Sequence, residues 1–244
     1  MKTILEVEVG STAHGTGTGS DDLDLMRVVI EDADTFVGFH DQDTWVERTK
    51  PEGVRSEPGD VDLVTYGLRK YLRLALKGNP SVLLALFIPN GPLTRVCTPE
   101  GYGLSGLSQF LVAKTVFGPY RGYMEQQKQL LLGKRGQMRV HRPELVEEFG
   151  YDTKYAGHIL RLGFQGEELL STGRLTIPMP EKQRDAVIEC RRGEMDRDWA
   201  LAEITESQKR LKEAFLQSPL PETPNRSAVE AWMVQTYLDN WRRD

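Results

Sequence analysis

The stretch that decides the fold reads GSTAHG at residues 10–15 and continues through a Gly/Thr-rich segment into SDDLDL at residues 20–25. It lies between the run ILEVEV at residues 4–9 and an apolar run at residues 25–30, and both are typical of β-strands. The pattern therefore predicts a strand, a glycine turn and a second strand. Because side chains two apart in a strand point to the same side, Asp22 and Asp24 place two carboxylates on one face.

Two convergent carboxylates are typical of a site for a hard divalent cation. Magnesium takes oxygen ligands and is commonly held by one or two carboxylates together with substrate phosphates. Backbone amides of a Gly-Ser turn can bind a phosphate, which makes Gly10 and Ser11 candidates for that role. The plainer interpretation of a D-x-D pair taken alone is an ordinary solvated acidic loop.

Two other phosphate-binding motifs fit this stretch less well. Residues 15–19 read GTGTG, but the Rossmann fingerprint requires a helix directly after its glycines, whereas an acidic strand is predicted here. The P-loop requires a Gly-Lys-Ser/Thr sequence, which this stretch does not contain.

A Gly-Ser pair, a short spacer and D-x-D before an apolar strand resemble the signature of the polymerase-beta nucleotidyltransferase superfamily. The pattern GSTAHGT…SDDLDL is similar to the RNA-ligase-associated, RNA-repair branch of its predicted nucleotidyltransferases. The resemblance implies an α+β fold, with a polymerase-beta-like mixed sheet, flanking helices and a helical C-terminal domain. His14, in the same turn, joins Gly10 and Ser11 in the expected nucleotide-binding set.

The composition is that of an ordinary globular protein, with 244 residues of which 39% are apolar and 27% charged. The chain starts without a signal-peptide pattern, and no apolar run approaches about 18 residues. We expect a cytoplasmic protein with no membrane partner. Cys97 and Cys190 have no metal-ligand spacing, so we expect two reduced thiols.

A second acidic strand is predicted at residues 60–66, DVDLVTY, where Asp60 and Asp62 share a face. A third carboxylate beside the first two would complete a two-metal site. In the family that the chain resembles, the third acid precedes a Y-x-L-R-K helix and a G-N-P turn. The sequence DLVTYGLRKY…KGNP matches with Asp62 in that position, and Asp60 stays the alternative.

The segment after this strand predicts a helix over residues 68–76 that ends at Gly78-Asn79-Pro80. Arg69 and Lys70 of this helix are weaker candidates for phosphate binding. Residues 81–86 read SVLLAL, where the resemblance leads us to expect a glutamate, so we assign no role to that acid here. This apolar segment predicts a buried helix.

Between these strands and in the C-terminal half, the patterns are less specific. Residues 31–59 predict a long loop with one short strand near Trp45, and residues 90–106 predict turns. Helical patterns follow at residues 107–118, 120–132, 143–149, 152–171, 181–189, 196–217 and 226–242. We expect a catalytic domain over residues 1–95, a helical domain over 96–218 that closes on nucleotide and acceptor, and a linker with a docking helix over 219–244.

One helical pattern carries a basic stripe, because Lys154, His158 and Arg161 fall at i, i+4 and i+7. Three potentially cationic groups on one stripe repel unless an anion lies among them, so we expect a phosphate there. The alternative is a solvated basic face. The sequence YDTKYAGHILRL is similar to the family's C-terminal K-x-A-x-H-x-x-R block, which favours nucleotide binding.

The resemblance implies a metal-dependent nucleotidyltransferase, which moves a nucleoside monophosphate from a nucleoside triphosphate to an acceptor hydroxyl and releases pyrophosphate. Asp22, Asp24 and Asp62 would act in catalysis by holding two Mg²⁺ ions, for which Mn²⁺ can substitute. Asp62 would also be the general base. ATP is among the expected nucleotides, with the preference left open.

The association with RNA ligases implies an RNA end as acceptor, with tRNA among the candidates. Residues 121–142 hold six basic side chains against one acid, and Lys134, Arg135 and Arg139 are the expected acceptor contacts. A solvated helix face and loop is the alternative for this segment. The net charge of -5 argues against a protein that coats nucleic acid by general electrostatics. Transfer to a protein or small-molecule hydroxyl, or a non-catalytic nucleotide-binding protein of this fold, are the alternatives.

Overall fold

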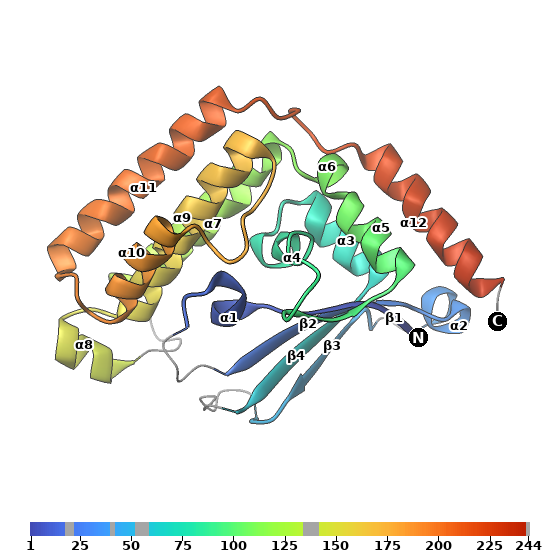
Figure 1. Ribbon diagram of the computed structural model, residues 1–244, viewed down its shortest axis with the longest axis horizontal. Coiled ribbons are helices and arrows are strands. Elements are labelled where there is room, and N and C mark those ends of the chain that lie inside the picture. The colour runs from blue at the N-terminus through green and yellow to red at the C-terminus, as the bar shows by residue number, and fades with distance from the viewer. Residues whose placement is uncertain (18–21, 40–41, 52–58, 134–141, 243–244) are drawn as a thin grey trace.

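The computed structural model describes residues 1–17, 22–39, 42–51, 59–133 and 142–242. A five-stranded sheet carries short helices on one face, and longer helices of the C-terminal half form an outer layer beyond them (Figure 1). The protein therefore has the expected α+β architecture, a mixed sheet with flanking helices followed by a largely helical half. In the part of the chain that is described, no helix combines the length and apolar character needed to cross a membrane.

The sheet has the strand order β3-β4-β2-β1-β5. Strands β2 and β4 run parallel, and the other neighbouring pairs are antiparallel. The strands are β1 (Lys2–Glu8), β2 (Leu23–Ile30), β3 (Thr44–Arg48), β4 (Val61–Gly67) and β5 (Thr94–Cys97). In the parallel pair Asp24 lies beside Asp62 and Met26 beside Val64. The two acids therefore stand at the start of adjacent strands, on the face that continues into the buried Met26.

The helices divide into a short set near the sheet and a longer set further out. They are α1 (Gly10–His14), α2 (Ala33–Val37), α3 (Leu68–Leu76), α4 (Pro80–Ala85), α5 (Pro99–Gly106), α6 (Ser108–Leu111), the 3₁₀ turn η1 (Lys114–Val116), α7 (Phe117–Leu131), α8 (Pro143–Phe149), α9 (Thr153–Thr172), α10 (Glu181–Arg191), α11 (Arg197–Gln217) and α12 (Arg226–Trp241). Helix α4 is almost wholly buried, as its apolar sequence predicts.

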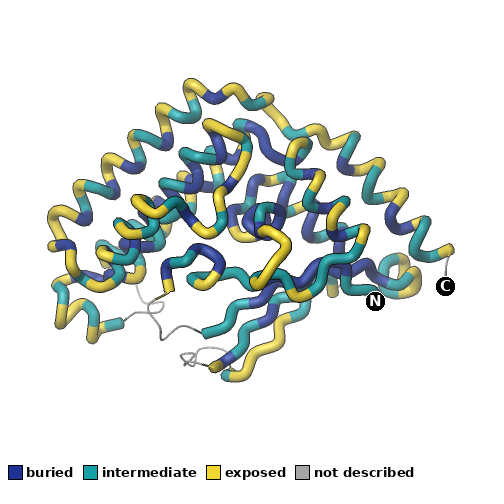
Figure 2. The backbone as a smooth tube through the Cα atoms, in the orientation of Figure 1, coloured by how far each residue is buried: buried dark blue, intermediate teal, exposed yellow. Residues whose placement is uncertain are grey.

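Helix α9 is the centre of the helical half and packs against α7, α10 and α11 (Figure 1). Asp152 caps its first turn by accepting a hydrogen bond from the amide of Tyr155, and Gly173 ends it in a left-handed conformation. A side chain at Gly163 would overlap Ser207 of α11, so a glycine here lets the two helices approach closely. Figure 2 shows the result, with buried residues inside and exposed residues along the outer face of α11.

Several elements differ from the sequence predictions. Residues 90–106 contain strand β5 and helix α5, where only turns were predicted. Their glycines give α5 low intrinsic helix propensity. The helix forms because Thr98 caps it by accepting from the Gly101 amide, Pro99 occupies its first turn, and Gly101 lies against the carbonyl of Ile4 in β1.

Three further differences are smaller. The predicted glycine turn contains the short helix α1, the predicted loop 31–59 contains α2, and the predicted helix 107–118 is divided among α6, η1 and the start of α7. The expected boundary after residue 95 falls within β5, which pairs with β1. The division into three units stays a prediction.

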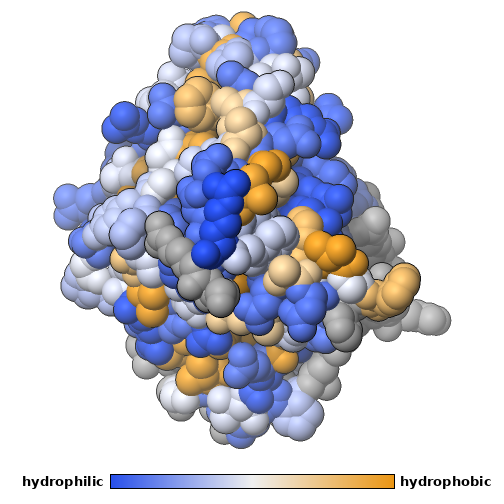
Figure 3. Space-filling view, turned by 90° about the vertical axis from the view of Figure 1, so that its right-hand side faces the viewer, coloured by the Kyte–Doolittle hydropathy of each residue, from blue (hydrophilic) through white to orange (hydrophobic). Residues whose placement is uncertain are grey.

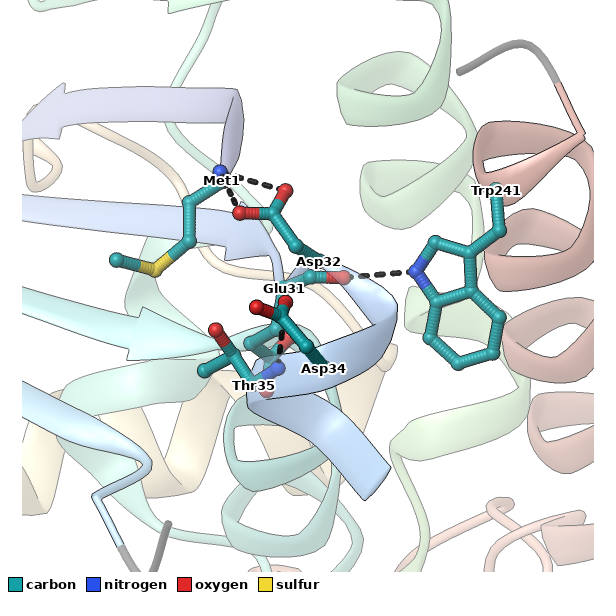
Figure 4. A network of polar contacts seen from close by, with 6 residues as sticks. All are labelled: Met1, Glu31, Asp32, Asp34, Thr35 and Trp241. Atoms are coloured by element: carbon teal, nitrogen blue, oxygen red, sulfur yellow. Dashed lines mark hydrogen bonds and ion pairs between the residues drawn. The ribbon is translucent and has the colours of Figure 1, made fainter. Parts of the chain in front are cut away.

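Helix α12 returns from the outer layer to the end of the sheet where β2 finishes, beside α2 (Figure 1). Tyr237 donates to the Glu31 carboxylate at 2.5 Å, and the Trp241 indole donates to the Glu31 carbonyl at 2.9 Å, a contact drawn in Figure 4. The N-terminal amino group pairs with the neighbouring Asp32. At this end of the molecule apolar residues form small patches among polar ones (Figure 3).

Candidate active site

Three acids meet where β2 and β4 begin. Asp24 and Asp62 are neighbours in the parallel register, and Asp22 precedes Asp24 by two residues. One carboxylate oxygen of each lies within 4.8 Å of the others, and this is the one such group of possible metal ligands among the described residues. Asp60 is buried before β4, where its carbonyl accepts the Leu23 amide at 2.9 Å, and it is not part of the group. The geometry therefore favours Asp62 over Asp60.

Gly10 brings the start of α1 directly against these acids. Its φ of 65° lies in the left-handed region, and a Cβ at this position would overlap the Asp24 carboxylate. The neighbouring Val9 amide donates to the Asp24 carbonyl at 2.9 Å. Both the backbone conformation and the close approach therefore require glycine at position 10.

A cavity of about 390 Å³ opens beside the acids. One wall is formed by Gly10, Ser11 and His14 of α1 together with Asp22 and Asp24. The opposite wall comes mainly from α9 and α10 and contains Lys154, Tyr155, His158, Arg161 and Arg191. Asp62 is not in the lining and joins the site through the acid group alone. An anionic wall thus faces a cationic one.

The basic stripe of α9 faces this cavity. Lys154, His158 and Arg161 all line it, with Lys154 exposed and the other two half-buried. A smaller cavity of about 260 Å³ shares His158 and Arg161 and reaches Ser81 of α4. The stripe therefore meets the acids across one space.

The stripe carries less positive charge than its sequence predicted. Burial and the nearby Arg161 lower the pKa of His158 to about 3, and the same two causes hold the pKa of His14 well below its usual value. Burial also lowers the pKa of Arg161 to about 10, which leaves it charged at neutral pH. Both imidazoles are therefore neutral, and the cations of the α9 stripe are Lys154 and Arg161.

Two arginines of the cavity wall were not among the predicted site residues. Arg191 of α10 donates through Nη1 to the Thr16 carbonyl, which ties α10 to the segment after α1. Arg142 pairs with Asp152 at 3.2 Å, and its guanidinium lies 5.5 Å from the centroid of the Tyr155 ring. Arg191 lies in the sequence IECRRGE at residues 188–194, which is also similar to the C-terminal sequence of the family named above, and this similarity is the signal that the sequence offers for it.

Arg69 and Lys70 lie away from this cavity, contrary to the prediction. Strand β4 carries the chain from Asp62 to Gly67 before α3 begins, and each strand residue spans about 3.3 Å. The guanidinium of Arg69 lies 4.1 Å from the centroid of the Phe36 ring, and the Lys70 amino group pairs with Asp43 at 3.0 Å. Both side chains therefore belong to the opposite end of the sheet.

The expected acceptor contacts Lys134, Arg135 and Arg139 lie outside the described residues. The described members of that basic segment have separate surroundings. Lys128 contacts Gln208 at 3.0 Å, whereas Arg142 lines the cavity. Of the described basic residues of this segment, only Arg142 therefore lines the cavity.

We compared the chain with known protein families, curated proteins and solved structures. A family model described as "RNA repair pathway DNA polymerase beta family" matches residues 1–235. A search of the curated proteins gave no match. Among solved structures, a nucleotidyltransferase-like protein from Exiguobacterium sibiricum 255-15 is similar at 10% identity and a TM-score of 0.33, over 88% of this chain and 69% of that one.

Proposed function

Because the chain belongs to the RNA repair pathway DNA polymerase beta family, we propose that it transfers a nucleoside monophosphate from a nucleoside triphosphate to a hydroxyl at an RNA end. One observation carries the proposal. Three carboxylates converge within 4.8 Å beside a cavity whose opposite wall holds Lys154 and Arg161. A metal-bound triphosphate needs ligands of both kinds, acids for the metal and cations for the phosphates.

The acid group fits magnesium. Asp22, Asp24 and Asp62 offer oxygen ligands only, which is the preference of Mg²⁺, and Mn²⁺ accepts the same ligands. Gly10 leaves the Asp24 carboxylate the space that a larger residue would fill. Metal held by these three acids would supply a lower pKa for an attacking hydroxyl and would stabilise developing negative charge.

Residues of the chain itself would bind the triphosphate, neutralise its charge and accept the proton of the attacking hydroxyl. Ser11, with the backbone of Gly10, would donate hydrogen bonds to the triphosphate, and Lys154 and Arg161 would neutralise the charge that develops on it. The neutral imidazoles of His14 and His158 would line the phosphate site without adding charge to it. Asp62 belongs to the acid group but not to the cavity lining, which favours it as the acid on the acceptor side and as the general base.

A labelling experiment tests this function. The protein is incubated with each labelled nucleoside triphosphate and Mg²⁺, with bulk transfer RNA, with other RNA ends, or with no added acceptor. We expect label on RNA, release of pyrophosphate, and no transfer by Asp62→Asn. Label on the protein itself would identify a protein hydroxyl, and not RNA, as the acceptor. No transfer from any nucleotide would overturn the enzyme assignment.

The basic segment offers a separate test of the acceptor. If Lys134, Arg135 and Arg139 contact RNA phosphates, neutralising all three should lower the slope of log affinity against log salt by about two to three units. RNA binding would weaken whatever the sequence, while nucleotide binding would persist. An unchanged slope would remove this segment from the acceptor site.

A further inference from the structure

Arg161, His14 and Gln165 form a closed triangle of contacts at the cavity wall. Nη1 of Arg161 lies 2.8 Å from both His14 Nε2 and Gln165 Oε1, and Gln165 Nε2 lies 3.1 Å from His14 Nδ1. His14 and Gln165 are only 3% and 4% exposed. Their polar atoms must therefore find partners within the protein.

The hydrogens of this triangle do not match its acceptors. Three contacts need three acceptors, but Arg161 only donates, while a neutral His14 and the Gln165 amide supply one acceptor each. When Arg161 donates to Nε2 of His14, the imidazole hydrogen is on Nδ1 and faces the NH₂ group of Gln165. If the amide turns, its NH₂ group faces the Arg161 guanidinium instead, and two donors again meet. If the imidazole hydrogen is on Nε2, that N–H faces the guanidinium, with the same result. One side of the triangle always joins two donors.

Arg161 also lacks an acidic partner in the described chain. Its hydrogen bonds go to His14, Gln165 and, at 3.4 Å, His158, which are all neutral groups. The nearby Arg191 adds positive charge rather than a counter-ion. A half-buried guanidinium at a cavity wall, surrounded by neutral acceptors, would gain by moving to an anion.

We propose that His14 and Gln165 are positioning residues, which hold Arg161 in an incompletely satisfied arrangement from which it moves to an incoming phosphate-type oxyanion. The guanidinium leaves Gln165 for the anion but keeps its contact with Nε2 of His14, and the Gln165 amide then turns so that its Oε1 accepts the Nδ1 hydrogen of His14. The contact between two donors disappears, and this relief adds to anion affinity. The identification of the anion as the triphosphate of a nucleotide rests on the proposed function.

The isosteric substitution Gln165→Glu tests the inference. A carboxylate accepts from both Arg161 and His14, so the triangle becomes fully hydrogen-bonded and Arg161 gains a counter-ion. We expect the melting temperature to rise by about 2–4 °C. Affinity for inorganic triphosphate with Mg²⁺, measured by calorimetry, should fall by about tenfold or more. A residue that only supported the fold would not move these two quantities in opposite directions.

A double-mutant cycle with Arg161→Ala separates this mechanism from a general charge effect. Without Arg161 the new carboxylate has no cationic partner in the triangle, so Gln165→Glu should lower the melting temperature instead of raising it. A stabilisation of the same size in both backgrounds, or an unchanged triphosphate affinity in Gln165→Glu, would overturn the inference.

The inference and the proposed function can fail separately. A wild-type protein that binds no inorganic triphosphate overturns the inference directly. If it binds triphosphate and responds to Gln165→Glu as expected, but transfers no nucleotide, the inference stands and the proposed function fails. If the protein transfers nucleotide but Gln165→Glu changes neither the melting temperature nor the triphosphate affinity, the proposed function stands and the inference fails.

Discussion

Acids lie at both ends of the parallel strand pair β2 and β4, but their surroundings differ. Beyond the end of β2, the Glu31 carboxylate accepts from Tyr237 at 2.5 Å and from the Leu68 amide at 3.1 Å. Burial, and then the Glu31 carboxylate, raise the pKa of Tyr237, so it remains a donor. At the start of the same strands, Asp22, Asp24 and Asp62 converge within 4.8 Å of one another. Three neighbouring carboxylates repel one another, and the two donors to Glu31 stabilise its negative charge.

This difference separates an acid that joins elements of the fold from acids that converge beside a cavity. Glu31 joins the end of β2 to the start of α3 and to α12, and a Cβ on Gly67 would overlap its carboxylate. Asp22 and Asp24 instead line a cavity that also contains cations, and Asp62 lies beside these two acids. Convergence next to a cavity, rather than the acidic residue type, is therefore the useful signal of function.

The largest expected effect is at the aspartate end. Asp24→Asn, or Asp22→Asn, should abolish nucleotide transfer, because magnesium would lose a charged ligand. Without metal the melting temperature should be unchanged or slightly higher, since the substitution removes repulsion between carboxylates. Transfer assays and thermal melts check both parts. Substantial remaining activity, or a collapsed fold, would contradict the metal-site assignment.

A second prediction compares arginines from the two ends. Arg161→Ala should weaken triphosphate binding by about 1.5–3 kcal/mol, the scale of a lost hydrogen bond to a charged group. Arg69→Ala is the matched control, because Arg69 lies over Phe36 and should leave the affinity unchanged. Calorimetry with each variant measures the difference. Equal losses for the two would remove the distinction between the ends.

A third prediction concerns the Glu31 end. Tyr237→Phe removes the donor to Glu31 and the acceptor for the Arg69 amide, both inside a buried contact. We expect a loss of about 1–2 kcal/mol of unfolding free energy, with nucleotide transfer unchanged. Leu238→Ala is a control on the same helix, because Leu238 is 38% exposed. Chemical denaturation measures the stability of each variant. A loss of activity in Tyr237→Phe would show that the two ends are coupled.

The convergence of the three aspartates agrees with the sequence prediction, and part of its signal is local. The spacing of Asp22 and Asp24 alone places both on one strand face. The pairing of Asp24 with Asp62 was not derivable from periodicity, since it depends on a parallel register between distant strands, and the resemblance supplied it. Arg69 and Lys70 are weaker candidates for phosphate binding from the sequence. They follow Asp62 closely along the chain, but strand β4 runs from Asp62 to Gly67 and carries both residues to the other end of the sheet.

The contacts that close the site are the least predictable. Gln165 continues the α9 stripe four residues after Arg161, yet its contact with His14 joins residues 151 positions apart. Similarly, the helix over Pro99–Gly106 depends on a cap and on packing against β1, which its glycine-rich sequence does not reveal. Local patterns therefore predict which residues carry charge, whereas tertiary packing decides which charges meet.

The smallest expected effect is on the pH dependence of stability, and it again distinguishes the two ends. Folding holds the pKa of His158 at about 3 and lowers that of His14, whereas an unfolded histidine titrates near pH 6.5. Below that pH the unfolded chain binds more protons than the folded one, so stability should fall as pH decreases from about 6.5. His158→Gln should make this loss smaller by about 1 kcal/mol at pH 5.5, while Tyr237→Phe should leave the slope unchanged. Denaturation at pH 7.5 and 5.5 measures both slopes. The same slope in His158→Gln and the wild type would mean that folding does not lower the pKa of His158, and that the α9 stripe gains a third cation as the pH falls below about 6.5.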